Sequence, residues 1–194
     1  MAASIRRLVV GISGASGSIL GVRLLELLQP LPVETHLVIT PAACKTLSLE
    51  CHYTCEQVRA LATRVYADDD LSAPIASGSF HTDGMVVIPC SIKSLSGIAN
   101  SYTGNLLVRA ADVTLKEGRS LVLVVRETPL HRGHLRLMSL AAEAGAVIFP
   151  PVPAFYTHPQ SLDMMLDQLL GRVLKRLGID NEYYQPWDGN HVGA

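Results

Sequence analysis

Residues 8–21 (LVVGISGASGSILG) constrain the fold of this chain more than any other stretch. They begin with an apolar run typical of a buried strand, pass through a turn of glycines and serines, and restart as an apolar helix that runs to residue 28. A strand, a small-residue turn and a helix in this order aim free backbone N–H groups and the positive end of the helix dipole at an anion. The spacing is G-x-x-G-x-x-G, which differs from the G-x-G-x-x-G of dinucleotide-binding folds. The stretch therefore predicts either a phosphate-binding turn or a tight turn without a ligand.

Strand and helix patterns alternate along the rest of the chain. Strands are predicted at residues 8–10, 33–39, 85–88, 121–125 and 147–149, and helices at 18–28, 41–50, 55–63, 95–100, 106–115, 131–144 and 161–178. Hydrophobic residues make up 48% of the chain and aromatic residues only 5%, so the core is aliphatic, as it is around buried parallel strands. We therefore predict a single α/β domain over residues 1–194, with a doubly wound, mostly parallel sheet in a three-layer arrangement.

Small or polar side chains follow the predicted strands at the points where those strands end. They are residues 13–17, Thr40, residues 91–94 (expected as a loop), and Arg126 with Glu127. The carboxyl ends of parallel strands lie at one edge of a sheet, where open α/β sheets bind their ligands. An NAD-binding fold needs an acidic residue near the end of its second strand, and Thr40 stands there instead. The pattern therefore argues against NAD and favours a mononucleotide.

Charge and apolar runs exclude several classes of partner. The net charge of −1 gives no reason to expect nucleic acid or an anionic membrane as a partner. No apolar run approaches the ~18–20 residues of a membrane-spanning helix. The first apolar run stops at Gly11, which is too early for a signal peptide. These features predict a cytoplasmic protein without a membrane span.

Two short clusters have the residue types of a metal site, Cys51-His52-x-x-Cys55 and His131-x-x-His134, but neither has a further ligand signal. The four cysteines (Cys44, Cys51, Cys55 and Cys90) include no C-x-x-C and lack the paired spacing of a secreted chain. We therefore expect partly buried thiols beside a helix rather than a metal site, which agrees with a cytoplasmic protein.

The helix predicted at residues 161–178 carries a wide apolar stripe, and a tail with Tyr183, Tyr184 and Trp187 follows it. An apolar stripe on a terminal helix covers the sheet or meets another subunit. We therefore expect this helix and tail to take part in the contacts of an oligomer.

Six motifs, in order along the chain, resemble the UbiX-type flavin prenyltransferases. They are GISGASG, IASGSF, PCSIKSLSGIA, RAADVTLKEGR, VLVVRETPLHRGHLRLM and PPVPAFYTHPQS, and the resemblance extends from about residue 8 to residue 187. The family has a Rossmann/flavodoxin-like sheet and generally assembles as a dodecamer. The resemblance therefore implies this fold, an FMN-binding domain and a homo-oligomer, specifically a dodecamer.

The resemblance also implies an activity. Members of the family join a dimethylallyl group from dimethylallyl phosphate to N5 and C6 of reduced FMN without a metal, and several also use the pyrophosphate. The product, prenylated FMN, is handed to a UbiD-type decarboxylase. The chain is thus expected to be a metal-independent prenyltransferase that acts on FMN.

By their positions in these motifs, three groups of residues are implied to form the site. FMN contacts are expected from Gly14, Ala15, Ser16, Thr40, Ser91, Ile92, Lys93, Ser94 and Arg126; prenyl-phosphate contacts from Lys116, Tyr156, Arg172 and Trp187; and roles in the chemistry from Ser16, Glu50 and Glu127. The family usually has serine where this chain has Thr40, which keeps the hydroxyl donor and adds a methyl group.

These residue types suit the reaction. Cleavage of the allylic C–O bond leaves negative charge on the phosphate, which Lys116 and Arg172 can stabilise without magnesium. An aromatic surface such as that of Trp187 can stabilise the allylic cation. Ring closure at C6 requires loss of a proton, for which Glu50 or the released phosphate is a base.

Two other functions agree with parts of the pattern. A flavin-dependent cysteine decarboxylase has the same broad fold but uses a histidine on its first helix, and residues 18–28 contain none. A non-catalytic FMN-binding accessory subunit would keep the FMN loops, but it would not need Lys116, Tyr156 and Arg172 together.

Overall fold

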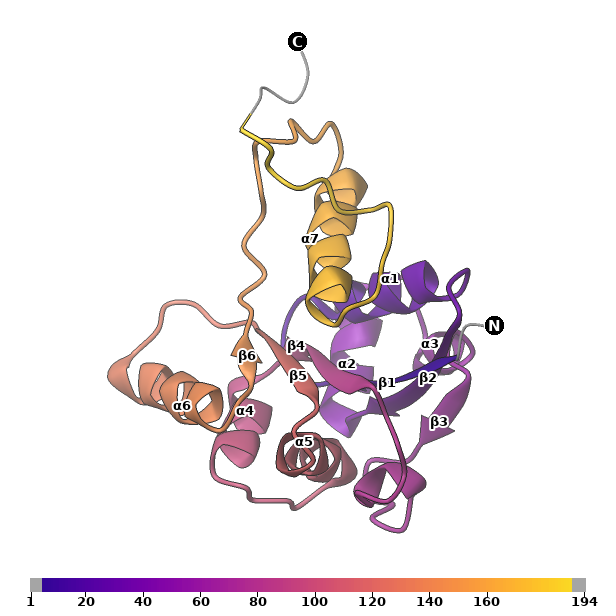
Figure 1. Ribbon diagram of the computed structural model, residues 1–194, viewed down its shortest axis with the longest axis vertical. Coiled ribbons are helices and arrows are strands. Elements are labelled where there is room, and N and C mark those ends of the chain that lie inside the picture. Colours follow the sequence, from indigo (N-terminus) through magenta and orange to yellow (C-terminus); the bar gives the residue numbers. More distant parts are fainter. Residues whose placement is uncertain (1–4, 190–194) are drawn as a thin grey trace.

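Six parallel strands form one sheet within residues 5–189, the part of the chain that the structure, a computed structural model, describes (Figure 1). The strands are β1 (Arg6–Ile12), β2 (Val33–Ile39), β3 (Arg64–Tyr66), β4 (Gly84–Cys90), β5 (Ser120–Val125) and β6 (Val147–Ile148). Their order in the sheet is β3-β2-β1-β4-β5-β6, and each pairs with its neighbour in parallel. The predicted doubly wound, parallel α/β architecture is confirmed.

Helices cover both faces of this sheet. One face carries α1 (Ser18–Leu28), α2 (Pro41–Glu50), α3 (Cys55–Arg59) and α7 (Leu162–Arg176); the other carries α4 (Ile92–Ala99), α5 (Leu106–Lys116), α6 (Arg132–Glu143) and the 3-10 helix η1 (Pro74–Ala76). Alternate strand residues supply the two cores, so that Val10 of β1 packs with the first set and Val9 with the second. Neighbouring strands β1 and β4 lie where the chain changes face, the point at which open α/β sheets bind ligands.

Strand β3 is the one strand that the sequence patterns do not predict, so the expectation of five strands is wrong. Its three residues include Arg64 and Val65, which are exposed, and the strand therefore lacks the apolar run of the others. It forms because its backbone pairs with residues 36–38 of β2 at the edge of the sheet. Short edge strands carry little pattern of their own in the sequence.

Two helices differ from their predicted bounds. The segment expected as a loop at residues 91–94 is the start of α4, because Ser91 Oγ caps the helix by accepting a hydrogen bond of 3.2 Å from the Ser94 N–H. Helix α3 ends at Arg59 rather than at residue 63, because the Thr63 hydroxyl accepts a hydrogen bond from the backbone N–H of Thr35 on β2. The other predicted helices agree with the structure to within two residues at each end.

Cys44 and Cys55 form a disulfide, so the expectation of free thiols is wrong for these two residues. The turn between α2 and α3 brings their Cα atoms to 5.3 Å, and a separation of 11 residues in the chain carries no signal for this contact. Cys51 and Cys90 are free. Within residues 5–189, neither the cysteine cluster nor the histidine pair belongs to a group of three His, Cys, Asp or Glu side chains that could hold a metal ion.

Helix α7 and the chain segments on either side of it form a projection from the body of the molecule (Figure 1). The helix is anchored on the sheet side by Leu170, Val173 and Leu174, which are completely buried in the core shared with α1. Among the described helices, α7 included, none is long and apolar enough to cross a membrane.

A polar cluster also ties α7 to α1. Arg23 of α1 donates hydrogen bonds to both carboxylate oxygens of Asp167 on α7, at 2.8 and 3.0 Å, and to Glu26 at 3.0 Å. The Tyr53 hydroxyl donates to the other oxygen of Glu26 at 2.7 Å. The hydrogen bonds with Asp167, and then those with Glu26, raise the pKa of the Arg23 guanidinium. Bidentate arginine–carboxylate contacts of this kind are the stronger form of ion pair.

We expect the Arg23→Ala variant to lose about 1 kcal/mol of unfolding free energy, which is a Tm decrease of roughly 2–4 °C for a domain of this size. The loss follows because α7 keeps its apolar contacts but no longer has its ion pair to α1. Thermal unfolding followed by circular dichroism measures it. Arg59→Ala is the matched control, since the ion pair of Arg59 is with the exposed Glu56 on its own helix. Equal Tm values for the two variants would contradict a clamping role for Arg23.

Candidate active site

The sequence-predicted FMN residues lie where four adjacent strands end, at one edge of the sheet. Strand β1 leads into residues 14–16, β2 into Thr40, β4 into Ser91 and β5 into Arg126. Because the four strands are parallel, their carboxyl ends meet at the same edge. The prediction that these segments come together is confirmed.

Ser13 joins the ends of β1 and β4 at this edge. Its side chain is completely buried, and its Oγ donates a hydrogen bond of 2.8 Å to the carbonyl of Pro89 and accepts one of 2.8 Å from the N–H of Ser91. The two bonds hold the glycine turn against the start of α4. The sequence patterns include Ser13 in the turn without singling it out, and a hydroxyl directly after a buried strand is the signal that could have done so.

The glycine turn lies directly against the N-terminus of α2. A Cβ on Gly14 would stand 2.5 Å from the Cβ of Ala42, so a larger residue there would force the turn and the helix apart. Thr40 caps α2, because its Oγ1 accepts a hydrogen bond of 3.2 Å from the Ala43 N–H. Since Oγ1 serves as an acceptor in this bond, its own hydrogen can be donated to a ligand.

A carboxylate of the protein itself occupies the N-terminus of α1. Glu50, the last residue of α2, accepts hydrogen bonds from the backbone N–H groups of Gly17 at 2.8 Å and Ser18 at 3.4 Å. The prediction that the start of this helix binds a ligand phosphate is therefore wrong, because Glu50 already takes the dipole and the free donors. The turn before the helix keeps donors of its own, since in the described part of the chain the N–H groups of Gly14 and Ser16 meet no protein acceptor.

The pKa of the Glu50 carboxyl lies below its ordinary value. Partial desolvation raises this pKa, but the hydrogen bond with the Ser16 side chain, the bonds from Gly17 and Ser18, and the positive charge of Arg126 together outweigh that effect. Glu50 is therefore ionised at neutral pH. Of the residues that the sequence assigned to the site, Ser16 and Arg126 thus both act on Glu50.

This set of donors and charges fits FMN. A flavin mononucleotide carries one phosphate and a flat ring, and the edge offers the N–H groups of Gly14 and Ser16, the Thr40 hydroxyl and the exposed guanidinium of Arg126. The turn residues 14–16 are partly exposed, so an anion can approach the N–H groups of Gly14 and Ser16.

The residues of the SIKS segment fall into two pairs. The Ser91 hydroxyl donates to the Ser94 hydroxyl at 3.2 Å, and Ser94 is buried next to the strand ends. Ile92 and Lys93 instead line a groove of about 510 Å³ between α4 and α6. Within one chain, therefore, the two serines lie with the β4 strand end and the other two residues face the groove.

Glu127 follows Arg126 at the end of β5, but its carboxylate does not join the one of Glu50. Its Oε1 accepts a hydrogen bond of 3.0 Å from the N–H of the next residue, Thr128, and its side chain is exposed. Within residues 5–189 the structure thus brings together two of the three residues expected to act in the chemistry, Ser16 and Glu50.

A second cavity opens at the end of β6, beside α7, and has a volume of about 280 Å³. Its lining is mostly apolar, and its polar side chains are those of Tyr156, Gln168, Arg172 and Tyr184. The remaining lining residues are Ile148, Phe149, Pro150, Val152, Ala154 and Leu169. The Arg172 guanidinium stands 6.0 Å from the centre of the Phe149 ring. The rings of Tyr156 and Trp187 meet edge to face at 5.5 Å. Three of the four residues predicted to bind the prenyl phosphate therefore gather here.

Two polar residues of this cavity, Gln168 and Tyr184, are absent from the sequence-predicted site. Gln168 is only 6% exposed, and its amide donates to the Tyr156 hydroxyl at 3.1 Å. Burial, and then the neighbouring Tyr184 hydroxyl, raise the pKa of Tyr156, so its hydroxyl stays protonated at neutral pH. A lone amide next to the apolar stripe of a helix is the signal that could have marked Gln168.

Lys116 lies at the opposite edge of the sheet from these sites. It is the last residue of α5, and β5 begins four residues later at Ser120, so Lys116 stands beside the amino ends of the strands. Its ammonium group pairs with Glu117. The expectation that Lys116, Tyr156 and Arg172 grip one phosphate is therefore wrong for a single chain.

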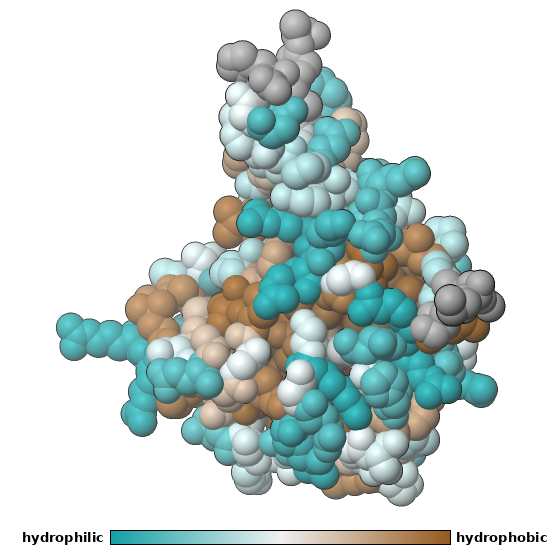
Figure 2. Space-filling view, in the orientation of Figure 1, coloured by the Kyte–Doolittle hydropathy of each residue, from teal (hydrophilic) through white to brown (hydrophobic). Residues whose placement is uncertain are grey.

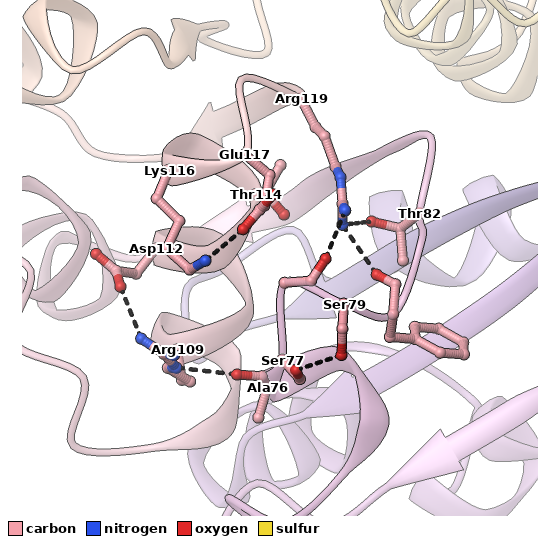
Figure 3. Close-up of polar contacts among 12 residues, drawn as sticks. Ala76, Ser77, Ser79, Thr82, Arg109, Asp112, Thr114, Lys116, Glu117 and Arg119 are labelled. Atoms are coloured by element: carbon pink, nitrogen blue, oxygen red, sulfur yellow. Dashed lines mark hydrogen bonds and ion pairs between the residues drawn. The ribbon is translucent and has the colours of Figure 1, made fainter.

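The loop of the IASGSF motif lies beside Lys116 at that edge. Arg119 donates hydrogen bonds to the carbonyls of Gly78 at 2.8 Å and Phe80 at 3.0 Å, which fixes the loop against the end of α5 (Figure 3). A Cβ on Gly78 would stand 2.6 Å from the Lys116 Nζ. Two of the six motifs thus form one polar cluster, away from the FMN edge of the same chain.

Comparison with known proteins agrees with this geometry. The model of the family described as Flavoprotein matches residues 2–166. The chain is 58% identical over 187 residues to flavin prenyltransferase UbiX of Escherichia coli strain K12, and the match covers 95% of this chain and 99% of that protein.

Two solved structures are similar over almost their whole length. AnUbiX (PadA1), solved in complex with FMN and dimethylallyl pyrophosphate, has a TM-score of 0.93 and 48% identity, and the match covers 95% of this chain and 98% of that one. The dodecameric FMN-dependent UbiX-like decarboxylase from Escherichia coli O157:H7 has a TM-score of 0.91 and 48% identity, over 94% of this chain and 100% of that one.

Proposed function

We propose that this chain, which belongs to the UbiX family of flavin prenyltransferases, joins the dimethylallyl group of dimethylallyl phosphate to N5 and C6 of reduced FMN. The observation that carries the proposal is that two complementary sites share the carboxyl edge of one sheet. One is a bare glycine turn beside an ionised carboxylate, Glu50, and the other is an apolar cavity with the cation Arg172. The first suits a flavin nucleotide and the second a prenyl phosphate.

The residues at the strand ends hold FMN in this proposal. They are Gly14, Ala15, Ser16, Thr40, Ser91, Ile92, Lys93, Ser94 and Arg126. Bound reduced FMN supplies the nucleophilic N5 and the C6 carbon. The Thr40 hydroxyl and the N–H groups of the turn bind as donors, and Arg126 adds a positive charge next to the Glu50 carboxylate.

The cavity at α7 holds the prenyl donor. Arg172 and the protonated Tyr156 hydroxyl bind the phosphate and stabilise the negative charge that grows on it as the C–O bond breaks. Phe149 and Trp187 offer aromatic surfaces to the dimethylallyl group, whose positive charge develops at the same time. Because side chains supply both stabilising effects, the proposal needs no metal ion.

Glu50 is the base in this proposal. Its carboxylate is ionised at neutral pH, and Ser16 and the two backbone N–H groups hold it at the start of α1, next to the turn that would bind FMN. It can therefore accept the proton that leaves C6 when the new ring closes. The phosphate released from the donor is the other acceptor, and Glu127, at the end of β5, is proposed as the third residue of the chemistry.

A direct assay tests the proposed function. The protein is incubated without oxygen with reduced FMN and dimethylallyl phosphate, and the mass of the extracted flavin is measured by mass spectrometry. We expect a gain of one C5H8 unit, and a parallel reaction with dimethylallyl pyrophosphate measures the choice of donor. An unchanged FMN mass with both donors would exclude the prenyltransferase and leave the FMN-binding accessory subunit.

The exposed apolar side chains support a homo-oligomer, and we propose a dodecamer, the state of the similar Escherichia coli O157:H7 protein. Several large ones lie on α7 and on the segments beside it: Val152, Phe155, Leu162, Met164 and Trp187 are each at least half exposed. Figure 2 shows further apolar surface around the base of the projection. A single chain would leave this surface in water.

An oligomer also gives Lys116 a role in the site. Within one chain, Lys116 and Arg172 lie at opposite edges of the sheet. Lys116 can therefore bind the phosphate only if it comes from a neighbouring copy. At dimethylallyl phosphate concentrations near the wild-type KM, we expect Lys116→Ala and Arg172→Ala each to have little activity and their co-expressed mixture to regain part of it, because random assembly leaves about one site in four with both side chains.

A second mixture is the control for that experiment. Tyr156 and Arg172 line one cavity of the same chain, so every site in a mixture of Tyr156→Phe and Arg172→Ala subunits lacks one of the two side chains. This mixture is therefore expected to contain no intact sites. Recovery in the first mixture but not in the second supports the role of Lys116 across subunits. No recovery in either would contradict it.

The product, prenylated FMN, is proposed to serve a UbiD-type decarboxylase. We also propose a cytoplasmic location, since both substrates are phosphate esters whose charge opposes passage through a bilayer; cell fractionation checks this. The cysteine decarboxylase alternative is not favoured, because α1 (Ser18–Leu28) has no histidine.

A further inference from the structure

We propose that Gln168 is a positioning residue of the prenyl-phosphate site, because its amide holds the Tyr156 hydroxyl and the backbone of Gln185 in one hydrogen-bonded unit beside Arg172. The proposal rests on the proposed function, in which Tyr156 and Arg172 bind the donor phosphate. It assigns to this buried amide the task of setting the direction of the Tyr156 hydroxyl.

The Gln168 amide is buried and uses every polar atom that it has. Its Oε1 accepts a hydrogen bond of 2.9 Å from the Gln185 N–H, and its Nε2 donates to the Gln185 carbonyl at 2.8 Å and to the Tyr156 hydroxyl at 3.1 Å. The bond from the Gln185 N–H fixes which end of the amide is the acceptor, so the NH2 group must face Tyr156. The orientation of the amide is therefore determined by the backbone, not by the tyrosine.

The Tyr156 hydroxyl has two partners in this unit. It accepts from Gln168 Nε2 and donates its own hydrogen to the Gln185 carbonyl at 2.9 Å. When a phosphate enters, the hydroxyl can turn its hydrogen to the ligand while still accepting from Gln168. The Gln185 carbonyl still accepts from the Gln168 amide, so that neither this carbonyl oxygen nor the Tyr156 hydroxyl oxygen loses all its hydrogen bonds. Leaving a buried acceptor without a donor is costly, and the amide removes that cost.

The unit also connects the two sides of the cavity. Gln168 lies one helical turn before Arg172 on α7, and Tyr156 lies on the proline-rich segment before the helix. Gln185 lies on the C-terminal segment, two residues before Trp187, whose ring meets that of Tyr156 at 5.5 Å. One side chain thus holds three segments around the space between the hydroxyl, the guanidinium and the indole.

The test compares Gln168→Met in the wild-type and Tyr156→Phe backgrounds of the full-length protein. Methionine keeps the length of the side chain but donates no hydrogen bond. In the wild-type background we expect the KM for dimethylallyl phosphate to rise about tenfold, with FMN affinity within about twofold of wild type. In the Tyr156→Phe background the same change should raise KM by less than about twofold, because the hydroxyl that it positions is gone.

Asn181→Ala is the matched structural control. Asn181 also ties the C-terminal segment to α7, because its amide donates to the carbonyl of Gly171 at 3.0 Å, and its Oδ1 accepts from the N–H of Tyr183 in its own segment at 3.1 Å. No hydrogen bond joins it to Tyr156 within the described residues. We expect it to lower Tm without the tenfold change in KM. If Gln168→Met fails to fold, Gln168→Asn, whose shorter amide cannot reach both partners, takes its place with the same expected KM.

The inference is overturned if Gln168→Met raises KM equally in both backgrounds, or if Asn181→Ala changes KM as much as Gln168→Met. Either result would assign to Gln168 only the anchoring of the C-terminal segment. Failure of the proposed function itself is distinguishable, because the wild-type protein would then form no prenylated flavin at all.

Discussion

The Glu50→Gln variant is expected to bind FMN like the wild-type protein but to form prenylated flavin at least about 100-fold more slowly. Glutamine still offers an oxygen to the N–H groups of Gly17 and Ser18, so the start of α1 keeps its cap. It lacks the carboxylate that is proposed to accept the C6 proton. Flavin fluorescence titration measures the binding, and the mass of the extracted flavin over time measures the rate.

Two further measurements sharpen this prediction. Glu143→Gln, at the exposed end of α6, is the control and should have wild-type turnover. Wild-type turnover in Glu50→Gln would remove Glu50 from the mechanism and leave the released phosphate as the base. A loss of FMN binding equal to the loss of turnover would mean that Glu50 only shapes the turn.

The pKa of Glu50 gives a signature in stability as well. Its folded-state pKa is lower than its ordinary value of 4.5, so the ionised form stabilises the folded protein above that pH. This contribution is complete above about pH 4.5 and is lost as the pH falls through the folded-state pKa. The Tm difference between wild type and Glu50→Gln should therefore be constant at neutral pH and decrease on acidification below that value.

The Arg172→Ala variant is expected to raise the KM for dimethylallyl phosphate by roughly 10–100-fold, while FMN affinity changes by less than about twofold. Arg172 lines the cavity at the end of β6, and its removal leaves Tyr156 as the proposed phosphate ligand of that chain. A charge-assisted hydrogen bond to a phosphate contributes about 1.5–3 kcal/mol, which gives this range. Steady-state kinetics with each substrate varied in turn measures it.

Arg176 provides the matched control for Arg172. It lies one turn further along α7, is exposed, and does not line the cavity. Arg176→Ala should therefore leave both the KM for dimethylallyl phosphate and the FMN affinity unchanged. Equal losses of FMN binding and prenyl-phosphate binding in Arg172→Ala would indicate that Arg172 stabilises the helix and its contact with Phe149 instead.

Local patterns predicted most of the fold correctly. The run of Leu8, Val9 and Val10, the glycines after it and the leucines at helical spacing are signals between residues that are close along the chain. They define β1 and α1 without any knowledge of the rest. The parallel topology then requires the following strand ends, with Thr40, Ser91 and Arg126, to lie at one edge.

Contacts between distant parts of the chain account for what the patterns missed. Glu50 is 32 and 33 residues from the N–H groups that it binds, and only the packing of α2 on the glycine turn brings them together. Because of the same packing, the N-terminus of α1, which was expected to bind a ligand, binds the carboxylate of Glu50 instead. The disulfide of Cys44 and Cys55 depends likewise on the angle of the turn between two helices, which composition does not specify.

The sequence alone determined the α/β class and the strand ends that carry the residues predicted to bind flavin, because side-chain type and spacing along the chain encode both. Its six motifs also carried the resemblance to the family. The tertiary structure alone decided how those residues divide. It joined Ser16, Glu50 and Arg126 at one place and Tyr156, Trp187 and Arg172 at another, added the buried amide of Gln168, and put Lys116 at the far edge. The reason is that α5 must return to the amino end of β5, which leaves Lys116, its last residue, at the edge opposite the cavity of Tyr156 and Arg172. In the proposed function, Lys116 therefore reaches that cavity from a second copy of the chain.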